Sequence, residues 1–253
     1  CLESAAGLPG LSEIEQLRCN YNKQERCATK NKKGEGQRRE SITLLGMVLT
    51  AAPSGDYDRR LVLLTTERGK ITAFAHGARR QGSSLMACSR TFVFGRFTLY
   101  EGRSAYNLQS AQVINYFEEL SADIEGACYG SYFLELAGLC SGENEDATEL
   151  LKLVYQSLRA LLTPAIPNSL VRRIFELKTM VIGGEYTQLP EEKVSDSCAY
   201  AWEYVVCTPV EELYRFVLKE PVEQEFARCV DRARKRFLPR QCKSLEILET
   251  LTG

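Results

Sequence analysis

Arginine is concentrated in one stretch of the chain. Nine basic side chains lie between residues 59 and 103, and eight of them are arginine. The planar guanidinium group is always charged, pairs with phosphate oxygens through two parallel hydrogen bonds and stacks on flat rings. This composition points to phosphate or nucleic-acid binding. The nine residues are Arg59, Arg60, Arg68, Lys70, Arg79, Arg80, Arg90, Arg96 and Arg103.

Two of these arginines belong to a polar, glycine-containing segment, residues 77–84 (GARRQGSS). Its backbone amides, hydroxyls and guanidinium groups are suited to holding phosphates. A solvated basic loop explains the segment equally well. Tyr57 and Phe74 lie near it in sequence, and exposed aromatic rings there would suit base stacking by a single-strand binder. A phenylalanine such as Phe74 is nevertheless more often a core residue.

Catalytic and metal-binding patterns are missing from the sequence. The single histidine, His76, excludes most histidine triads and multi-histidine metal sites. Nucleotide-binding glycine motifs and the G-x-S-x-G elbow do not occur. We interpret Asp56 and Asp58 as a loop paired with Arg59 and Arg60, with a hydrolase using both carboxylates as an alternative. We therefore predict no enzyme, no catalytic residue and no cofactor.

The ten cysteines include no C-x-x-C pair, and no secretory signal opens the chain. We predict reduced, buried thiols in a cytoplasmic protein rather than disulfides or a zinc site. No apolar run approaches the length of a membrane-spanning helix, so no membrane contact is expected.

The overall charge hides an asymmetry along the 253 residues. The formal net charge is -1, which excludes a uniformly basic nucleic-acid coat. Residues 41–120 hold nine basic and six acidic side chains, whereas residues 121–253 hold fifteen basic and twenty-one acidic ones. A mildly positive module beside an acidic one is a weak indication of nucleic-acid contact.

The positive module has the pattern of a small closed β-barrel. Short apolar, β-compatible segments alternate there with turn signals such as Pro53-Ser54-Gly55. Within 71–76, Ile71, Ala73 and Ala75 share one face and Phe74 the other, and the small residues suit a tight barrel interior. The expected strands are Ser41–Ala52, Leu61–Thr65, Ile71–His76, Phe92–Tyr100 and Ser104–Ile114.

From about residue 120 the apolar spacing becomes helical. Asp146 and Glu149 resemble a capping box, Gly183-Gly184 is a helix stop, and Ser195 is a helix cap. Residues 1–40 include the charged run Lys30–Glu40 and are expected to be disordered or a non-native extension. The expected helices lie at about 146–163, Leu170–Ile182, 195–206, Pro209–Val217 and Pro221–Phe237.

Three stretches resemble the RecO family of bacterial recombination mediators. They are GMVLTAAPSGDYDRRLVLLTTERGKITAFAHGARR (46–80), FGRFTLYEGRSAYNLQSAQVINYFEEL (94–120) and QCKSLEIL (241–248). The resemblance implies an α+β fold: an N-terminal five-stranded OB-type β-barrel, the nucleic-acid-binding domain at 41–118, followed by an all-helical domain at 119–253.

The resemblance also implies a non-enzymatic function. Members of the family bind single- and double-stranded DNA without reading sequence, promote strand annealing, and load RecA onto single strands coated by the single-strand-binding protein SSB. Their partners RecR, RecF, SSB and RecA, and a cytoplasmic, nucleoid-associated location, follow as expectations. An OB-type RNA-binding module and a protein-interaction module are the alternatives.

Carried over to this sequence, the resemblance assigns DNA binding to two groups of side chains. Arg79 and Arg80 lie in the loop, and Arg68 and Lys70 lie in a hairpin turn. Arg59 and Arg60 match a turn of the family and are included with them. Phe74 is included from the strand pattern rather than from the resemblance, because an exposed ring there would suit base stacking.

In the helical domain, Arg172 and Arg173 precede Phe175, and their partner is left open between DNA, a protein and Glu176. Many family members carry a four-cysteine zinc module after the helix that ends near Gly184. Residues 185–195 contain no C-x-x-C, so we expect this module and its metal to be missing.

Overall fold

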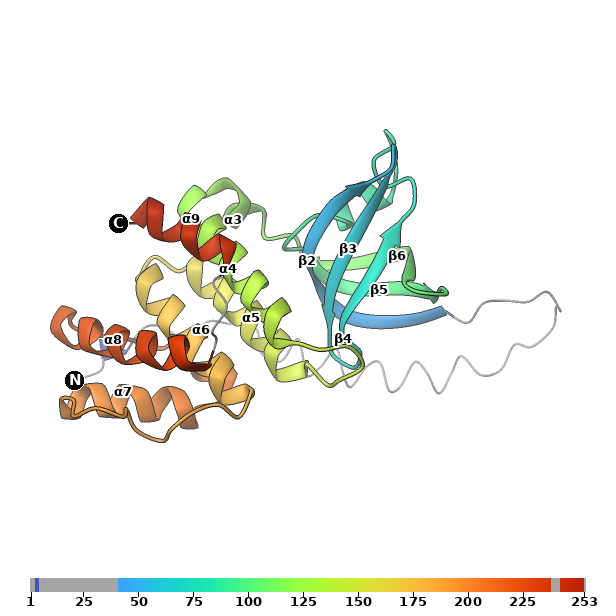
Figure 1. The fold of residues 1–253 in the computed structure, drawn as a ribbon. Helices are drawn as coiled ribbons and strands as arrows, with labels where there is room; N and C mark the ends of the chain where they lie inside the picture. The colour runs from blue at the N-terminus through green and yellow to red at the C-terminus, as the bar shows by residue number, and fades with distance from the viewer. Residues whose placement is uncertain (1–2, 5–40, 238–241, 253) are drawn as a thin grey trace.

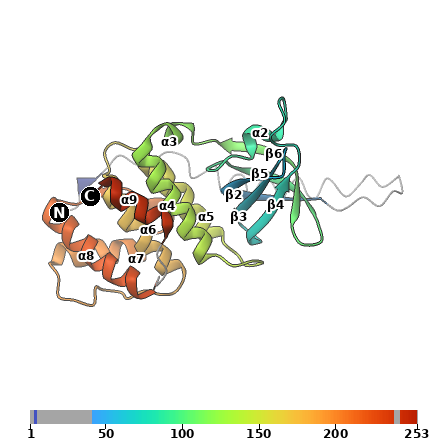
Figure 2. The ribbon, with the colours of Figure 1, turned by 45° about the horizontal axis from the view of Figure 1, so that its top comes forward.

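The computed structural model describes residues 3–4, 41–237 and 242–252. A β-barrel and a bundle of helices lie side by side, as Figures 1 and 2 show. Most of the predicted N-terminal extension lies outside the described residues. Its residues Glu3–Ser4 form a short strand, β1, which pairs antiparallel with β7 at Phe216–Val217 in the helical part.

Five strands close the barrel in the order β2-β3-β4-β6-β5. Neighbouring strands are antiparallel except for β4 and β6, which are parallel, and a short helix α2 lies between β4 and β5. This is the OB-type barrel that was expected, and only α2 was not foreseen. The elements are β2 (Ser41–Ser54), β3 (Asp58–Thr65), β4 (Gly69–Ala75), α2 (Leu85–Cys88), β5 (Phe94–Glu101) and β6 (Tyr106–Asn115).

The interior of the barrel explains the small residues of β4. Ala73 and Ala75 are fully buried among Leu61, Leu63 and Phe97. Side chains alternate between the two faces of a strand, so Phe74 points outward. The predicted alternation in this strand is confirmed.

The helical part follows from residue 118. None of the helices formed by the described residues is long and apolar enough to cross a membrane. The elements are α3 (Glu118–Ala122), α4 (Ile124–Cys140), α5 (Thr148–Leu161), α6 (Asn168–Ile182), α7 (Asp196–Cys207), the 3-10 turn η1 (Val210–Glu212), β7, α8 (Glu220–Phe237) and α9 (Lys243–Thr252).

Most of the predicted helix ends are confirmed. The Ser195 side chain accepts a hydrogen bond from the Cys198 amide at the start of α7, and Gly184, with φ +77°, follows the end of α6. The helix predicted at Pro209–Val217 is wrong. The segment makes one 3-10 turn and then extends, because Phe216 is buried in the core while its backbone pairs with β1. Tertiary pairing overrides the local helical pattern here.

The barrel and the helices share one hydrophobic core. The side chains of Met47, Leu64 and Phe94 point outward from the barrel and are buried against the helical part. The ring of Phe94 lies 4.6 Å from the ring of Tyr155 on α5. The part of the outer barrel surface that carries these residues is therefore covered by helices.

A hydrogen-bonded junction reinforces this contact at the turn between β3 and β4. The Lys70 amide donates to the Gly142 carbonyl (2.8 Å), and the Asn144 amide donates to the Arg68 carbonyl (2.9 Å). Gly69 has φ +58°, and a Cβ atom there would lie 2.4 Å from the Gly142 oxygen. Only glycine fits this close approach. Figure 1 shows the loop between α4 and α5 reaching this end of β4.

The C-terminal helix α9 begins on a carboxylate from another helix. Glu135 of α4 accepts hydrogen bonds from the backbone amides of Lys243 (3.1 Å) and Ser244 (2.8 Å), and from the Ser244 hydroxyl. Burial favours a higher pKa for Glu135, but the hydrogen bonds from Ser244 and Lys243 outweigh it and lower the pKa. The charged carboxylate thus caps the positive end of α9.

We predict that Glu135→Ala loosens α9, since its first amides lose their acceptor. Losing a cap costs about 1 kcal/mol, so amide hydrogen exchange in α9 should accelerate about fivefold at pH 7. Because the pKa of Glu135 is lowered in the folded protein, the same loosening should develop in the wild type as the pH falls below about 4. Glu246→Ala, an exposed change on α9 itself, is the control. Equal exchange rates in the two variants would contradict the cap.

Candidate nucleic-acid interface

The outer surface of the barrel is open at the end away from the junction. Arg60 on β3, Phe74 on β4 and Asn107 on β6 are register partners in a row across three strands. Arg60 is exposed, whereas Phe74 and Asn107 are half-buried. We call this row, together with residues 55–57 and 76–82, the distal face.

The two loops of the distal face are joined through arginines. The Arg79 amide donates to the Tyr57 carbonyl (2.8 Å), and the Arg79 side chain donates to the Gly55 carbonyl (3.2 Å). The Arg80 guanidinium lies 4.9 Å from the centre of the Tyr57 ring. Tyr57, Arg79 and Arg80 are all exposed, so both guanidinium groups and the ring are accessible to a ligand.

His76 binds this face together, a role that the sequence did not indicate. Its Nδ1 lies 2.7 Å from Oδ2 of Asp58, and its Nε2 lies 3.0 Å from Oδ1 of Asn107. The His76 and Phe74 rings are 6.3 Å apart and almost parallel, at 16°. Asp58 thus pairs with the His76 side chain and accepts a hydrogen bond from the Gly77 amide. The expected pairing of Asp58 with Arg59 and Arg60 is wrong. The alternation along β4 predicted that His76 lies on the same face as Phe74. The contact with Asn107 could not be predicted in this way, because it depends on the parallel pairing of β4 with β6.

Arg59 and Lys70, unlike the exposed Arg79, are half-buried and use their side chains to join elements of the fold. Nη1 of Arg59 donates to the Met86 carbonyl (3.0 Å) and to the carbonyl and hydroxyl of Ser89 (3.1 and 3.0 Å). This holds α2 against the end of the barrel. Nζ of Lys70 donates to the Gly138 carbonyl of α4 (2.5 Å). We therefore leave both out of the interface proposed below.

Arg68 is exposed but lies at the other end of β4. The strand runs from Gly69 to Ala75, and at about 3.3 Å per residue its ends are roughly 20 Å apart. The hairpin-turn residues and the loop arginines that were grouped by sequence are thus at opposite ends of the barrel. Arg60, Arg79 and Arg80 lie together at the end of β4 that is away from Arg68.

Arg172 and Arg173 are engaged inside the helical part. Glu176, which is fully buried, receives Nε of Arg172 and Nη1 of Arg173, each at 3.0 Å. Asp231 pairs with Arg173 at 2.8 Å, and Glu249 pairs with Arg172 at 3.4 Å. Of the three partners left open for these arginines, the structure shows Glu176.

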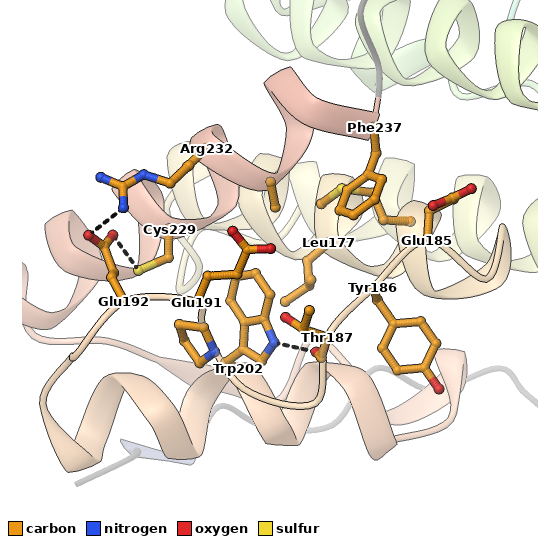
Figure 3. A pocket seen from close by; sticks show the side chains of 13 residues that line it. Leu177, Glu185, Tyr186, Thr187, Glu191, Glu192, Trp202, Cys229, Arg232 and Phe237 are labelled. Carbon is orange, nitrogen blue, oxygen red and sulfur yellow. Dashed lines mark hydrogen bonds and ion pairs between the residues drawn. The ribbon is translucent and has the colours of Figure 1, made fainter.

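A shallow hollow lies beneath the segment that follows α6, where the zinc module was expected to be missing (Figure 3). The Trp202 indole donates to the Thr187 carbonyl (2.9 Å), and Glu192 pairs with Arg232 (2.8 Å). The hollow offers about 20 Å³, which is room for about one water molecule. In the described part of the chain, no group of three or more histidine, cysteine, aspartate or glutamate side chains is placed to hold a metal ion.

The cysteines follow the expected pattern only in part. Among the residues that the structure describes, all seven cysteines are free thiols. Four of them are buried, whereas Cys128 is half-buried and Cys140 and Cys207 are exposed. The buried ones are Cys88, Cys198, Cys229 and Cys242.

The topology and the distal face define a class of protein: an OB-fold barrel carrying a helical bundle. OB folds bind oligonucleotides on their second and third strands and adjacent loops, and here those strands are β3 and β4. The models of the N-terminal and C-terminal parts of recombination protein O match residues 40–117 and 121–192. The chain belongs to the RecO family of DNA repair proteins.

Curated relatives agree with this assignment. The DNA repair protein RecO of Acetivibrio thermocellus is 26% identical over 240 residues, covering 81% of this chain and 95% of the relative. The RecO protein of Clostridium perfringens strain 13 is 25% identical over 235 residues, covering 81% and 96%. That of Clostridium novyi is 32% identical over 138 residues, and the match spans 54% of either chain.

We predict that Glu176→Ala strongly destabilises the helical part, since it removes the fully buried carboxylate that Arg172 and Arg173 share and leaves them only their outer partners Glu249 and Asp231. Removing one partner of a buried ion pair costs about 3–5 kcal/mol in free energy of unfolding. Glu212→Ala is the control, because Glu212 and its partner Arg215 are both solvent-exposed and 3.8 Å apart. Its effect should stay below about 0.5 kcal/mol. Urea unfolding at pH 7 measures both, and similar midpoints would refute the prediction.

Proposed function

We propose that this chain is a non-enzymatic DNA-binding mediator that holds single strands on its distal face. The observation that carries the proposal is the grouping of Arg60, Arg79 and Arg80 with the Tyr57 and Phe74 rings on the open OB surface. Arginines contact phosphates and aromatic rings stack on bases, and together they bind single strands without reading sequence.

Strand annealing follows from this mode of binding. Two strands can pair only if their base edges stay accessible while their backbones are held. Phosphate contacts from Arg79 and Arg80 hold the backbone and carry no sequence information. A ring such as Tyr57 contacts the flat face of a base and leaves its pairing edge free.

The family resemblance supplies the cellular setting of the proposal. The chain would promote annealing and RecA loading on single strands coated by SSB, together with RecR and RecF. It would also bind double-stranded DNA and act in the cytoplasm, at the nucleoid. The acidic helical part would repel DNA, so that strands stay on the barrel, and would leave its own surface to protein partners.

We predict that Arg80→Glu weakens binding of a single-stranded oligonucleotide at least tenfold at low salt, since a phosphate contact becomes a repulsion. If about four phosphates are neutralised, log affinity falls with log salt at a slope of about -3, and each lost contact flattens the slope by about 0.7. Fluorescence anisotropy over a salt series measures both quantities.

Arg68→Glu is a matched control for this experiment. It makes the same charge change on the same barrel, at an exposed position at the other end of β4. Its affinity should change less than about threefold at about 0.1 M salt, where the Debye length of about 10 Å is shorter than the roughly 20 Å between the two ends of β4. Equal losses in the two variants would refute the location of the site. Tighter binding of RNA than of DNA of equal length would favour the RNA-binding alternative.

The double variant Arg79→Glu/Arg80→Glu extends the test to function. We expect it to lose annealing of complementary strands precoated with SSB, because it no longer holds their backbones. The Arg68→Glu variant should anneal at the wild-type rate. Annealing by the double variant at the wild-type rate would show that the distal face is not used.

A further inference from the structure

The imidazole of His76 has an oxygen atom at each of its nitrogens. Oδ2 of Asp58 lies 2.7 Å from Nδ1, and Oδ1 of Asn107 lies 3.0 Å from Nε2. Neutral imidazole carries a single N–H, whereas imidazolium carries two. Only the protonated ring donates to both oxygens at once. With Oδ1 of Asn107 facing Nε2, the contacts match the charged form of the ring.

The charge of this group of residues depends on the same proton. The charged groups that face the pair are Asp58 from β3 and Arg80 from the loop after β4, and Asn107 from β6 is neutral. When His76 is protonated, the His76–Asp58 pair carries no net charge, and the arginines determine the electrostatic potential of the distal face. Without it, Asp58 leaves one uncompensated negative charge beside Arg80. Nε2 also becomes an acceptor, so its hydrogen bond to Oδ1 is lost unless the Asn107 amide turns over and donates from Nδ2.

We propose that His76 is a positioning residue whose protonation sets the affinity of the distal face for single-stranded DNA. The charged ring joins β3, β4 and β6 and neutralises Asp58, and its deprotonation weakens DNA binding. This inference rests on the proposed function, because it concerns the same face and the same ligand. It adds a pH dependence to a surface whose arginines stay charged throughout the physiological range.

The direction of the pKa shift agrees with this role. The hydrogen bond to Asp58, followed by the one to Asn107, raises the pKa of His76 above the usual 6.5, against a smaller opposing effect of burial. The hydrogen bond from the Gly77 amide, followed by that from His76, lowers the pKa of Asp58. Asp58 therefore stays charged while His76 titrates. The DNA-binding form is complete below pH 6.5 and is lost as the pH rises through the raised pKa of His76.

The test measures affinity for a fluorescent single-stranded oligonucleotide between pH 6 and 9 at low salt. We expect wild-type affinity to fall about threefold across this range, the effect of one charge near the phosphates. Raising the salt concentration should reduce the difference through screening. Because the chain has one histidine, the ring resonances in a proton NMR spectrum report the titration of His76 directly. Its midpoint should lie above 6.5 and coincide with that of DNA binding.

Two substitutions at this exposed position separate the charge states. His76→Gln fixes the neutral state and should show weak, pH-independent binding at the wild-type pH 9 level. His76→Lys fixes the charge and should bind across the range at the wild-type pH 6 level. Asp58→Asn removes the carboxylate, so the NMR midpoint should fall and binding at pH 9 should be stronger than in the wild type.

The outcomes distinguish this inference from the proposed function. Wild-type binding that is constant with pH while the NMR signal titrates would overturn the role of His76 and leave DNA binding intact. A pH dependence that persists unchanged in His76→Gln would assign it to another group and also overturn the role. Absence of DNA binding at every pH would instead overturn the proposed function.

Discussion

The contact between the β3–β4 turn and the loop after α4 is the constraint on which the rest of the structure depends. At Gly69 the two backbones approach so closely that a side chain has no room, and Lys70 anchors both its amide and its ammonium group in the helical part. The shared core around Phe94 and Tyr155 lies next to this junction. Together they cover the outer surface of the barrel next to the β3–β4 turn and leave the side chains of Arg60, Arg79 and Arg80 exposed. This decides which arginines can meet a ligand.

Arginines that are adjacent in the sequence show how the local environment decides the role of a side chain. Arg59 and Arg60 are adjacent in sequence, yet the first holds α2 in place and the second faces solvent, because side chains alternate along β3. Arg172 and Arg173 are also adjacent, and both form ion pairs with the buried Glu176. Of these four arginines, Arg59, Arg172 and Arg173 are held by groups inside the protein, and Arg60 is exposed to solvent.

On the distal face, the charged and aromatic side chains are held by contacts with one another and with the backbone. The Tyr57 carbonyl receives the Arg79 amide, and the Tyr57 ring lies under the Arg80 guanidinium. The His76–Asp58 pair ties the strands together beneath them. Such preorganisation lowers the entropy cost of binding a flexible strand, which is consistent with a site that grips backbone and leaves base edges free.

Much of this protein was predictable from local patterns. The alternation in 71–76, the hairpin turns and the helix boundaries at Gly184 and Ser195 act over a few residues, so the barrel and most helices could be inferred. The concentration of arginine in residues 59–103 was visible as composition, and the stretch 46–80 carried the resemblance to the RecO family.

Only the tertiary structure decided which of those side chains share a surface. The partners of Lys70, Arg172 and His76 lie 68, 77 and 31 residues away in their longest contacts, and no local pattern encodes such distances. The parallel pairing of β4 with β6 brings Asn107 to His76, and β1 overrides the helical pattern at Phe216. Sequence patterns specify what a segment prefers to be, whereas burial and pairing between distant segments determine what each side chain faces.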